Sequence, residues 1–244
     1  MAPLALDRYM DLLRSDGAAL LEAARSDLDR RVPACPDWTE RELLVHTGGV
    51  HRFWGDIAAR RLADPSESRP EPAPDDDPGI AAWYQDGLEK LVDTLSGSAP
   101  DEPVWSWSAR KEIGFIQRRM PQETAVHRWD AQDAVGDADP IDGQLAVDGV
   151  DEWLEVFGPA QDVTPNGAGE TIHLHRTDGE GEWLVRLQAD GIEVTRGHEK
   201  GDAALRGNAS DLLLALWRRI PLDRLEVLGD RAVTERFLGW QDLD

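Results

Sequence analysis

The sequence contains a single cysteine, Cys35, among 244 residues. One cysteine excludes an internal disulfide and a zinc site built from paired cysteines, and it agrees with a reducing compartment. No apolar run approaches the ~20 residues that a membrane-spanning helix requires. The N-terminal residues lack the basic start of a signal peptide, so we expect a cytoplasmic protein.

Positive charge is also scarce. The chain has 26 Lys and Arg against 48 Asp and Glu, which gives a formal net charge of −22. Polyanions would be repelled, so DNA, RNA and anionic membrane surfaces are excluded as partners. The sequence has no phosphate-binding loop and no GxGxxG motif, which argues against nucleotide chemistry. The length is sufficient for a real core, in one large domain or two smaller ones.

Apolar residues recur at helical spacing along the first part of the chain. We expect helices at residues 4–26, 39–61, 80–95, 113–136 and 142–157. A T-x-x-E capping box, Thr39 and Glu42, opens the second helix. The residues before it, 30–38, and the Pro- and Asp-rich residues 64–79 are predicted loops. Pro121 should kink the fourth helix or mark where its main segment begins.

Beyond residue 168 the pattern changes to short alternating runs separated by turns. We expect strands at residues 171–177, 183–188, 192–195, 202–206 and 225–228, and helices at 209–219 and 231–240. The predicted fold class is α plus α+β. A helical bundle over residues 1–160 precedes a small α+β domain over residues 168–244, with a Gly/Pro/Asn-rich linker between them.

Glu123 and His127 lie four residues apart in the fourth predicted helix. Side chains at this spacing lie on one face, which here also carries Ile116 and Met120 and should point into the core. A buried carboxylate and imidazole need a partner, and a divalent metal suits both groups. The alternative is a simple Glu–His hydrogen bond on a solvated face.

The second predicted helix supplies a third candidate ligand, His46. It shares an apolar stripe with Leu43, Val50, Phe53 and Ile57, whereas His51 falls roughly 140° around the helix, nearer the rim. His46 is either a core histidine bonded to the backbone or a metal ligand. Together, His46, Glu123 and His127 have the composition of a catalytic zinc site with an open position.

Three segments resemble the mycothiol-dependent maleylpyruvate isomerase family: VPACPDWTERELLVHTGGVHRFW, RRMPQETAVHRWDAQDAV and GDAALRGNASDLLLALWRRIPLDRLEVLGD. The resemblance extends over nearly the whole chain. It implies a DinB-like four-helix metal-binding bundle, followed by a small domain similar to sterol carrier proteins. Carried over by position, the metal ligands are His46, Glu123 and His127, the same three residues that helical geometry selects.

The resemblance also implies a chemistry. The cofactors would be a divalent metal, with zinc the first choice and nickel, iron or manganese as alternatives, and mycothiol, the small thiol of actinobacteria, as cosubstrate. An activated thiolate would add to a small electrophilic or anionic substrate, as an isomerase or an S-transferase. Two alternatives are a metal-binding sensor module without catalysis and a thiol-independent metallohydrolase. We expect a monomer or weak homodimer.

Four further residues are candidates for the site, the first from the resemblance and the others from their positions in the sequence. Arg219 matches an arginine that would reach an anionic substrate; alternatively it is a solvated cation at a helix end. Trp38 and Trp54 flank the ligand helix and are expected to line a pocket for the cofactor. Asp130 is expected either to orient a ligand imidazole or to form a surface ion pair with Arg128 or Arg119.

A few features remain outside this scheme. His173 and His175 alternate on a predicted strand, so they form either a surface metal site or part of an exposed strand face. His198 lies in a turn and receives no role. Gly48 and Gly49 cost helix stability just after His46, and we interpret them as permitting close helix approach or ligand access.

Overall fold

The structure is a computed structural model that describes residues 3–159 and 165–240. The chain divides into two compact units, Met1–Asp139 and Pro140–Asp244. The first is helical and the second is built on a mixed sheet, so the predicted fold class is confirmed. Within the described ranges, no helix is both long enough and apolar enough to cross a membrane.

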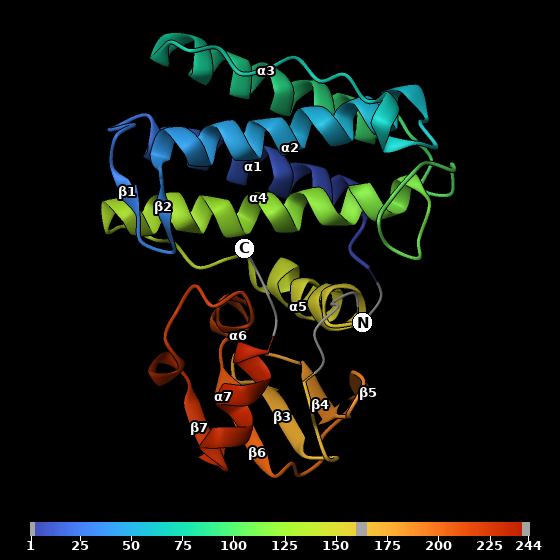
Figure 1. Cartoon of the computed structure of the whole chain (residues 1–244), viewed down its shortest axis with the longest axis vertical. Helices are drawn as coiled ribbons and strands as arrows, with labels where there is room; N and C mark the ends of the chain where they lie inside the picture. Colours follow the sequence, from blue (N-terminus) through green and yellow to red (C-terminus); the bar gives the residue numbers. More distant parts are fainter. Residues whose placement is uncertain (1–2, 160–164, 241–244) are drawn as a thin grey trace. The chain divides into compact units, whose positions relative to one another are not determined.

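Four long helices form the first unit: α1 (Leu6–Ala24), α2 (Glu40–Arg60), α3 (Asp77–Ser96) and α4 (Ile113–Val135). They lie side by side (Figure 1), and α1 and α2 each pack against both α3 and α4. Their apolar faces are buried, with Leu13, Leu91 and Ile116 fully inaccessible. A short 3₁₀ turn, η1 (Pro65–Glu67), interrupts the loop between α2 and α3.

A small hairpin leads into α2. Its strands are β1 (Arg31–Val32) and β2 (Cys35–Thr39), so the prediction of a plain loop here is wrong. Strands this short, with a proline inside, leave no alternating pattern to detect. The predicted capping box is confirmed, because the Thr39 hydroxyl accepts from the Glu42 amide and the Glu42 carboxylate accepts from the Thr39 amide at 2.6 Å.

Helix α4 runs without interruption through Pro121, so the expectation that its main segment begins there is wrong. Proline removes one backbone donor and costs roughly 3 kcal/mol inside a helix. Here burial outweighs that cost, because α4 is the most enclosed helix of the unit and Pro121 itself is buried. The helix is capped by Gly136, whose φ of +78° is the left-handed conformation that favours glycine.

The second unit begins with α5 (Gly143–Glu152), continued by a π-helical turn, η2 (Trp153–Phe157). Five strands follow in the spatial order β5-β4-β3-β6-β7, in which β3 and β6 are parallel and the other neighbours antiparallel. The strands are β3 (Thr171–Arg176), β4 (Glu182–Leu187), β5 (Ile192–Arg196), β6 (Ala203–Gly207) and β7 (Glu226–Gly229). The helices are α6 (Ala209–Leu216), η3 (Leu222–Arg224) and α7 (Arg231–Gly239).

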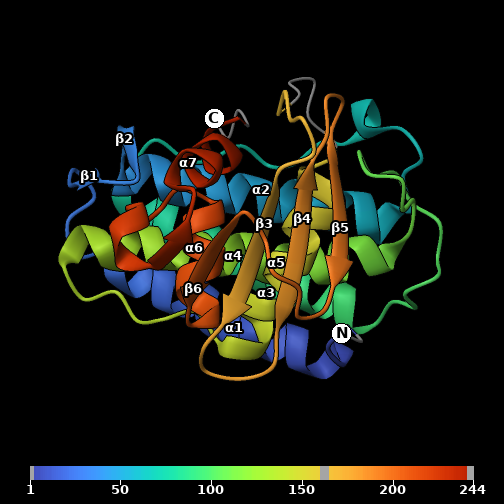
Figure 2. The ribbon, with the colours of Figure 1, turned by 90° about the horizontal axis from the view of Figure 1, so that it is seen from below.

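The sheet buries one face. Ile172, Leu174, Trp183 and Val185 on that face are at most 1 % exposed. The Trp183 indole donates to Asp151 Oδ1 of α5 at 2.7 Å. Helix α5, which the sequence analysis places in the bundle, thus packs with the sheet and with α6 in the second unit. The predicted linker, residues 160–168, lies partly outside the described residues. Figure 2 looks onto the other face of the sheet.

The two glycines after His46 have different surroundings. A Cβ built on Gly48 would come within 2.4 Å of the Trp83 ring of α3, whereas one on Gly49 meets no atom within 4 Å. The Trp83 ring cannot move aside freely, because its indole donates to the Glu71 carbonyl and Arg52 lies over its face. The expectation of close helix approach therefore holds for Gly48.

This contrast yields a matched pair of variants. Gly48→Ala should lower the free energy of unfolding, because the added methyl group clashes with a held ring. Gly49→Ala should raise it by up to about 1 kcal/mol, since alanine favours an unobstructed helix. Urea denaturation of both variants beside the parent measures the two changes. Equal effects of the same sign would contradict the assigned helix contact.

Candidate metal centre

Helices α2 and α4 bring together the three ligands expected from the sequence. His46 Nε2 lies 3.4 Å from Glu123 Oε1, and His127 Nε2 lies 3.2 Å from the same oxygen. One ligand atom from each of the three residues lies within 4.8 Å of the others. The two imidazoles therefore converge on one carboxylate oxygen from different helices.

The spacing of these atoms suits a metal ion. Zinc binds nitrogen and oxygen at about 2.0–2.2 Å, so ligand atoms of a tetrahedral site lie roughly 3.3 Å apart. The two separations in the structure, 3.4 and 3.2 Å, match that edge length. A carboxylate and two imidazoles are also ligands that divalent transition metals accept. The residues present therefore fit a divalent metal.

The candidate site is closed on one side and open on the other. The exposed fraction of the side chain rises from 8 % for His127, through 18 % for Glu123, to 36 % for His46. Trp38 of β2 packs against the more exposed histidine, with ring centroids 4.6 Å apart. The side of the site near His46 is thus the one that a small molecule can approach.

Asp130 fixes the orientation of His127. Its Oδ2 lies 3.0 Å from His127 Nδ1, and the aspartate is fully buried. Of the two alternatives for Asp130, the structure supports the orienting role, because an acceptor at Nδ1 leaves Nε2 directed at Glu123.

Arg119 balances the buried carboxylate. It forms an ion pair with Glu123 Oε2, on the side away from the histidines. Burial alone would raise the pKa of Glu123, but Arg119, His127 and His46 together hold that pKa well below its usual range. Burial likewise opposes protonation of His127, yet Glu123 and Asp130 raise the pKa of its imidazole to about 9.

His51 differs from expectation. It is fully buried, whereas His46 is partly exposed, so the predicted order of burial is wrong. A single apolar stripe implies one buried face, but α2 packs against α3 as well as α4 and so buries a second face. His51 lies 2.8 Å from the Thr124 hydroxyl and packs on Tyr84, and burial lowers its pKa to about 3. It is a neutral core residue.

Of the two tryptophans predicted to line the site, Trp38 lies beside the three candidate ligands. Trp38 joins the three ligands, with its ring centroid 6.2 Å from that of His127. Trp54 lies instead in an aromatic cluster, where it stacks on Trp105 at 5.5 Å. Arg219 belongs to the second unit, where it follows α6 and donates to the Trp217 carbonyl at 3.0 Å.

The sequence did not predict the environment of two charged residues, Arg119 and Glu40. Arg119 precedes Glu123 by one helical turn, a spacing that can reveal an ion pair. Glu40, the first residue of α2, is fully buried, and neither carboxylate oxygen has a hydrogen-bond partner among the residues described. Burial is the main reason that the pKa of Glu40 rises to about 7, and the nearby Asp130 raises it further. No local pattern distinguishes it from a helix-start glutamate.

The fold and these contacts define a class: a DinB-like helical bundle with a candidate His₂Glu metal centre, joined to a small α+β unit. The family model for the mycothiol maleylpyruvate isomerase N-terminal domain matches residues 10–132, and that for its C-terminal domain matches residues 144–236. The chain belongs to the mycothiol-dependent maleylpyruvate isomerase family, as the sequence resemblance implied.

Solved structures show the same fold. A crystal structure of the mycothiol-dependent maleylpyruvate isomerase superimposes with a TM-score of 0.59 at 14 % identity, covering 92 % of this chain and 93 % of that one. A histidine-to-alanine mutant of that isomerase gives a TM-score of 0.61 at 13 % identity, with the same coverage. The search of curated proteins found no match.

The unusual pKa of Glu40 predicts a pH-dependent stability. The group is protonated more readily in the folded chain, with a pKa of about 7, than at its ordinary value of 4.5. Between these values the folded state binds more protons, so this group lowers stability as pH rises. Glu40→Gln removes that penalty and should stabilise the protein relative to the parent by on the order of 2 kcal/mol between pH 5 and pH 8.

Chemical denaturation across this pH range measures the gap between variant and parent. Glu89→Gln, an exposed position on α3, serves as the control and should show no such gap. Parallel stability curves for Glu40→Gln and the parent would contradict the assignment.

Proposed function

We propose that the protein is a metal-dependent enzyme that adds an activated thiolate, of the mycothiol type, to a small electrophile. The observation that supports this most directly is the convergence of two imidazole nitrogens on one oxygen of Glu123, beside a partly exposed His46. Three protein ligands leave a position for an exogenous one, the arrangement of catalytic rather than structural sites. The family membership of both units agrees with this chemistry.

A divalent metal in this site, most simply zinc, would stabilise a bound thiolate and so lower the pKa of the thiol. The residues of the chain prepare the site for it. Arg119 keeps Glu123 ionised, and Asp130 presents the Nε2 of His127. The open side near His46 and Trp38 is where thiol and electrophile would enter.

Addition of the thiolate to the electrophile would form a carbon–sulfur bond, and what then happens to that bond decides the type of reaction. If the carbon–sulfur bond that forms is broken again after rotation, the thiol is regenerated and the reaction is a cis–trans isomerisation. If the bond is kept, the reaction is S-transfer. We propose Arg219 as the group that would bind an anionic substrate, and Trp38, which packs against His46, as a residue lining the thiol site.

Removal of a ligand tests the proposal. His46→Ala and Glu123→Ala should each hold about one equivalent less metal than the parent, by elemental analysis, and should lose metal-dependent consumption of thiol with electrophiles. Glu89→Ala, exposed on α3, should retain both properties. Thiol consumption by a variant that lacks this metal, or turnover that needs no thiol, would contradict the proposal; the second result would indicate a metallohydrolase.

The buried Asp130 gives a graded test. Asp130→Asn keeps the shape but removes the charge beside His127, and loss of such an outer contact typically weakens metal binding about 10–100-fold. Zinc titration against a chelator of known affinity would measure the change. Asp137→Asn, exposed just beyond α4, is the matched control. An unchanged zinc affinity in Asp130→Asn would show that the aspartate does not orient a ligand.

A further inference from the structure

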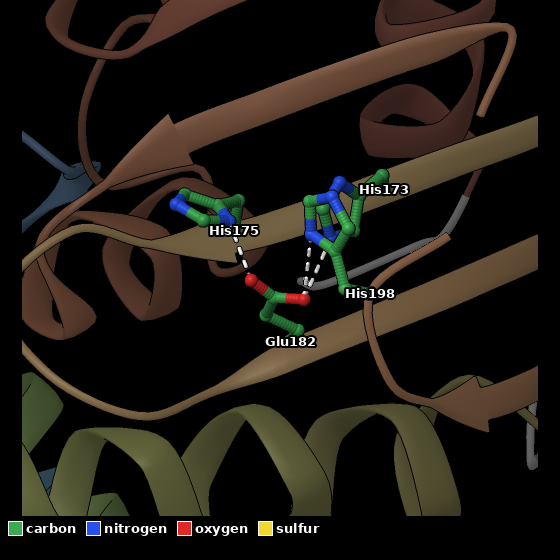
Figure 3. Close-up of side chains that lie close together, drawn as sticks. All are labelled: His173, His175, Glu182 and His198. Atoms are coloured by element: carbon green, nitrogen blue, oxygen red, sulfur yellow. Dashed lines mark hydrogen bonds and ion pairs between the residues drawn. The ribbon is translucent and has the colours of Figure 1, made fainter. Parts of the chain in front are cut away.

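The second unit holds another group of histidines. The chain has 6 histidines, and three of them, His173, His175 and His198, surround Glu182 (Figure 3). One ligand atom from each of the four residues lies within 4.8 Å of the others. This cluster comes from three successive segments of the sheet and is separate from the His46 site.

The sheet register accounts for two of the contacts. His175 of β3 lies directly opposite Glu182 of β4, and His173, two residues earlier, projects from the same face. His175 Nδ1 lies 2.8 Å from Glu182 Oε1. His173 Nε2 lies 3.6 Å from Glu182 Oε2, beyond hydrogen-bonding distance.

A glycine turn brings in the third histidine. Gly197 follows β5 with a φ of +138°, a conformation that side-chain-bearing residues rarely adopt. Its amide donates to the Glu182 carbonyl at 3.3 Å, which holds the turn beside β4. His198 then reaches back over the strand, and its Nδ1 lies 2.9 Å from Glu182 Oε2.

The single carboxylate of Glu182 does not provide a hydrogen-bond partner for all three imidazoles. His173 has a side chain only 7 % exposed, and its Nε2 has no hydrogen-bond partner among the residues described. An unsatisfied buried polar atom costs about 1–3 kcal/mol. The rings stand 5.1–6.1 Å apart between centroids, around a shared centre. A cation at that centre would satisfy the orphaned nitrogen and the carboxylate together.

We propose that His173, His175, Glu182 and His198 bind a divalent transition-metal ion of the zinc type. Three imidazoles and one carboxylate, with no thiolate, form a donor set that binds zinc, copper or nickel in preference to calcium or magnesium. Four protein ligands make a closed site, which indicates a structural ion rather than a catalytic one. Such an ion ties the segment after β5 to strands β3 and β4.

Zinc titration of the full-length chain tests this proposal. The His46→Ala variant removes the first site, so zinc that still binds reports on the second one. We expect this variant to bind about one equivalent in calorimetry and to show a higher melting temperature with zinc than without. Adding His175→Ala and His198→Ala should abolish both effects. His173 is left intact because its burial makes it a risk for folding.

Two comparisons keep the test decisive. Without metal, the triple variant should melt at the same temperature as His46→Ala, which separates loss of the site from loss of the fold. If it melts at a lower temperature, His198→Ala is added alone to His46→Ala, because the His198 side chain is 75 % exposed. Glu199→Ala, the exposed neighbour in the same turn, should leave zinc binding unchanged. No zinc binding by His46→Ala, or equal binding after the histidines are removed, would overturn the proposal.

Discussion

The helical unit depends on keeping one carboxylate ionised inside it. Moving a charged carboxylate out of water is costly unless opposite charge and hydrogen bonds accompany it. Glu123 obtains both mainly from its own helix, with Arg119 one turn before it and His127 one turn after. This arrangement requires α4 to be regular from 119 to 127. A break at Pro121 would separate the arginine from the carboxylate, so the continuity of α4 through a proline is part of the site.

Helix α2 must then present His46 at the correct position along α4. The capping box at Thr39 fixes where α2 begins, and the absence of a side chain at Gly48 lets the Trp83 ring of α3 pack against its backbone. The same helix places His51 in the core and His46 at the edge, five residues apart. The two histidines therefore differ in role because they face different neighbours: a threonine and a tyrosine for His51, a carboxylate and Trp38 for His46.

Local signals made much of this predictable. Helical periodicity, the capping box and the Glu123–His127 spacing each extend over only a few residues. They were enough to predict the long helices, the five strands of the second unit and the meeting of His46 with Glu123 and His127. What escaped prediction depends on distant partners. The burial of His51 required knowing that α2 packs against both α3 and α4. The raised pKa of Glu40 comes mainly from its burial by distant elements, with a smaller contribution from Asp130. His198 joined a cluster only through the β4–β5 register and the turn at Gly197.

The two histidine clusters differ in charge as well as in ligand number. Around the first, Arg119 offsets one of the two negative charges of Glu123 and Asp130. On the proposed function, a divalent ion bound there would give these groups a net positive charge, which would favour an anionic fourth ligand such as a thiolate over neutral water. In the second, no arginine pairs with Glu182 among the described residues, and the four side chains would supply all four ligands of the proposed ion. The same residue types thus suit an exchangeable ligand in the bundle and a fixed ion on the sheet.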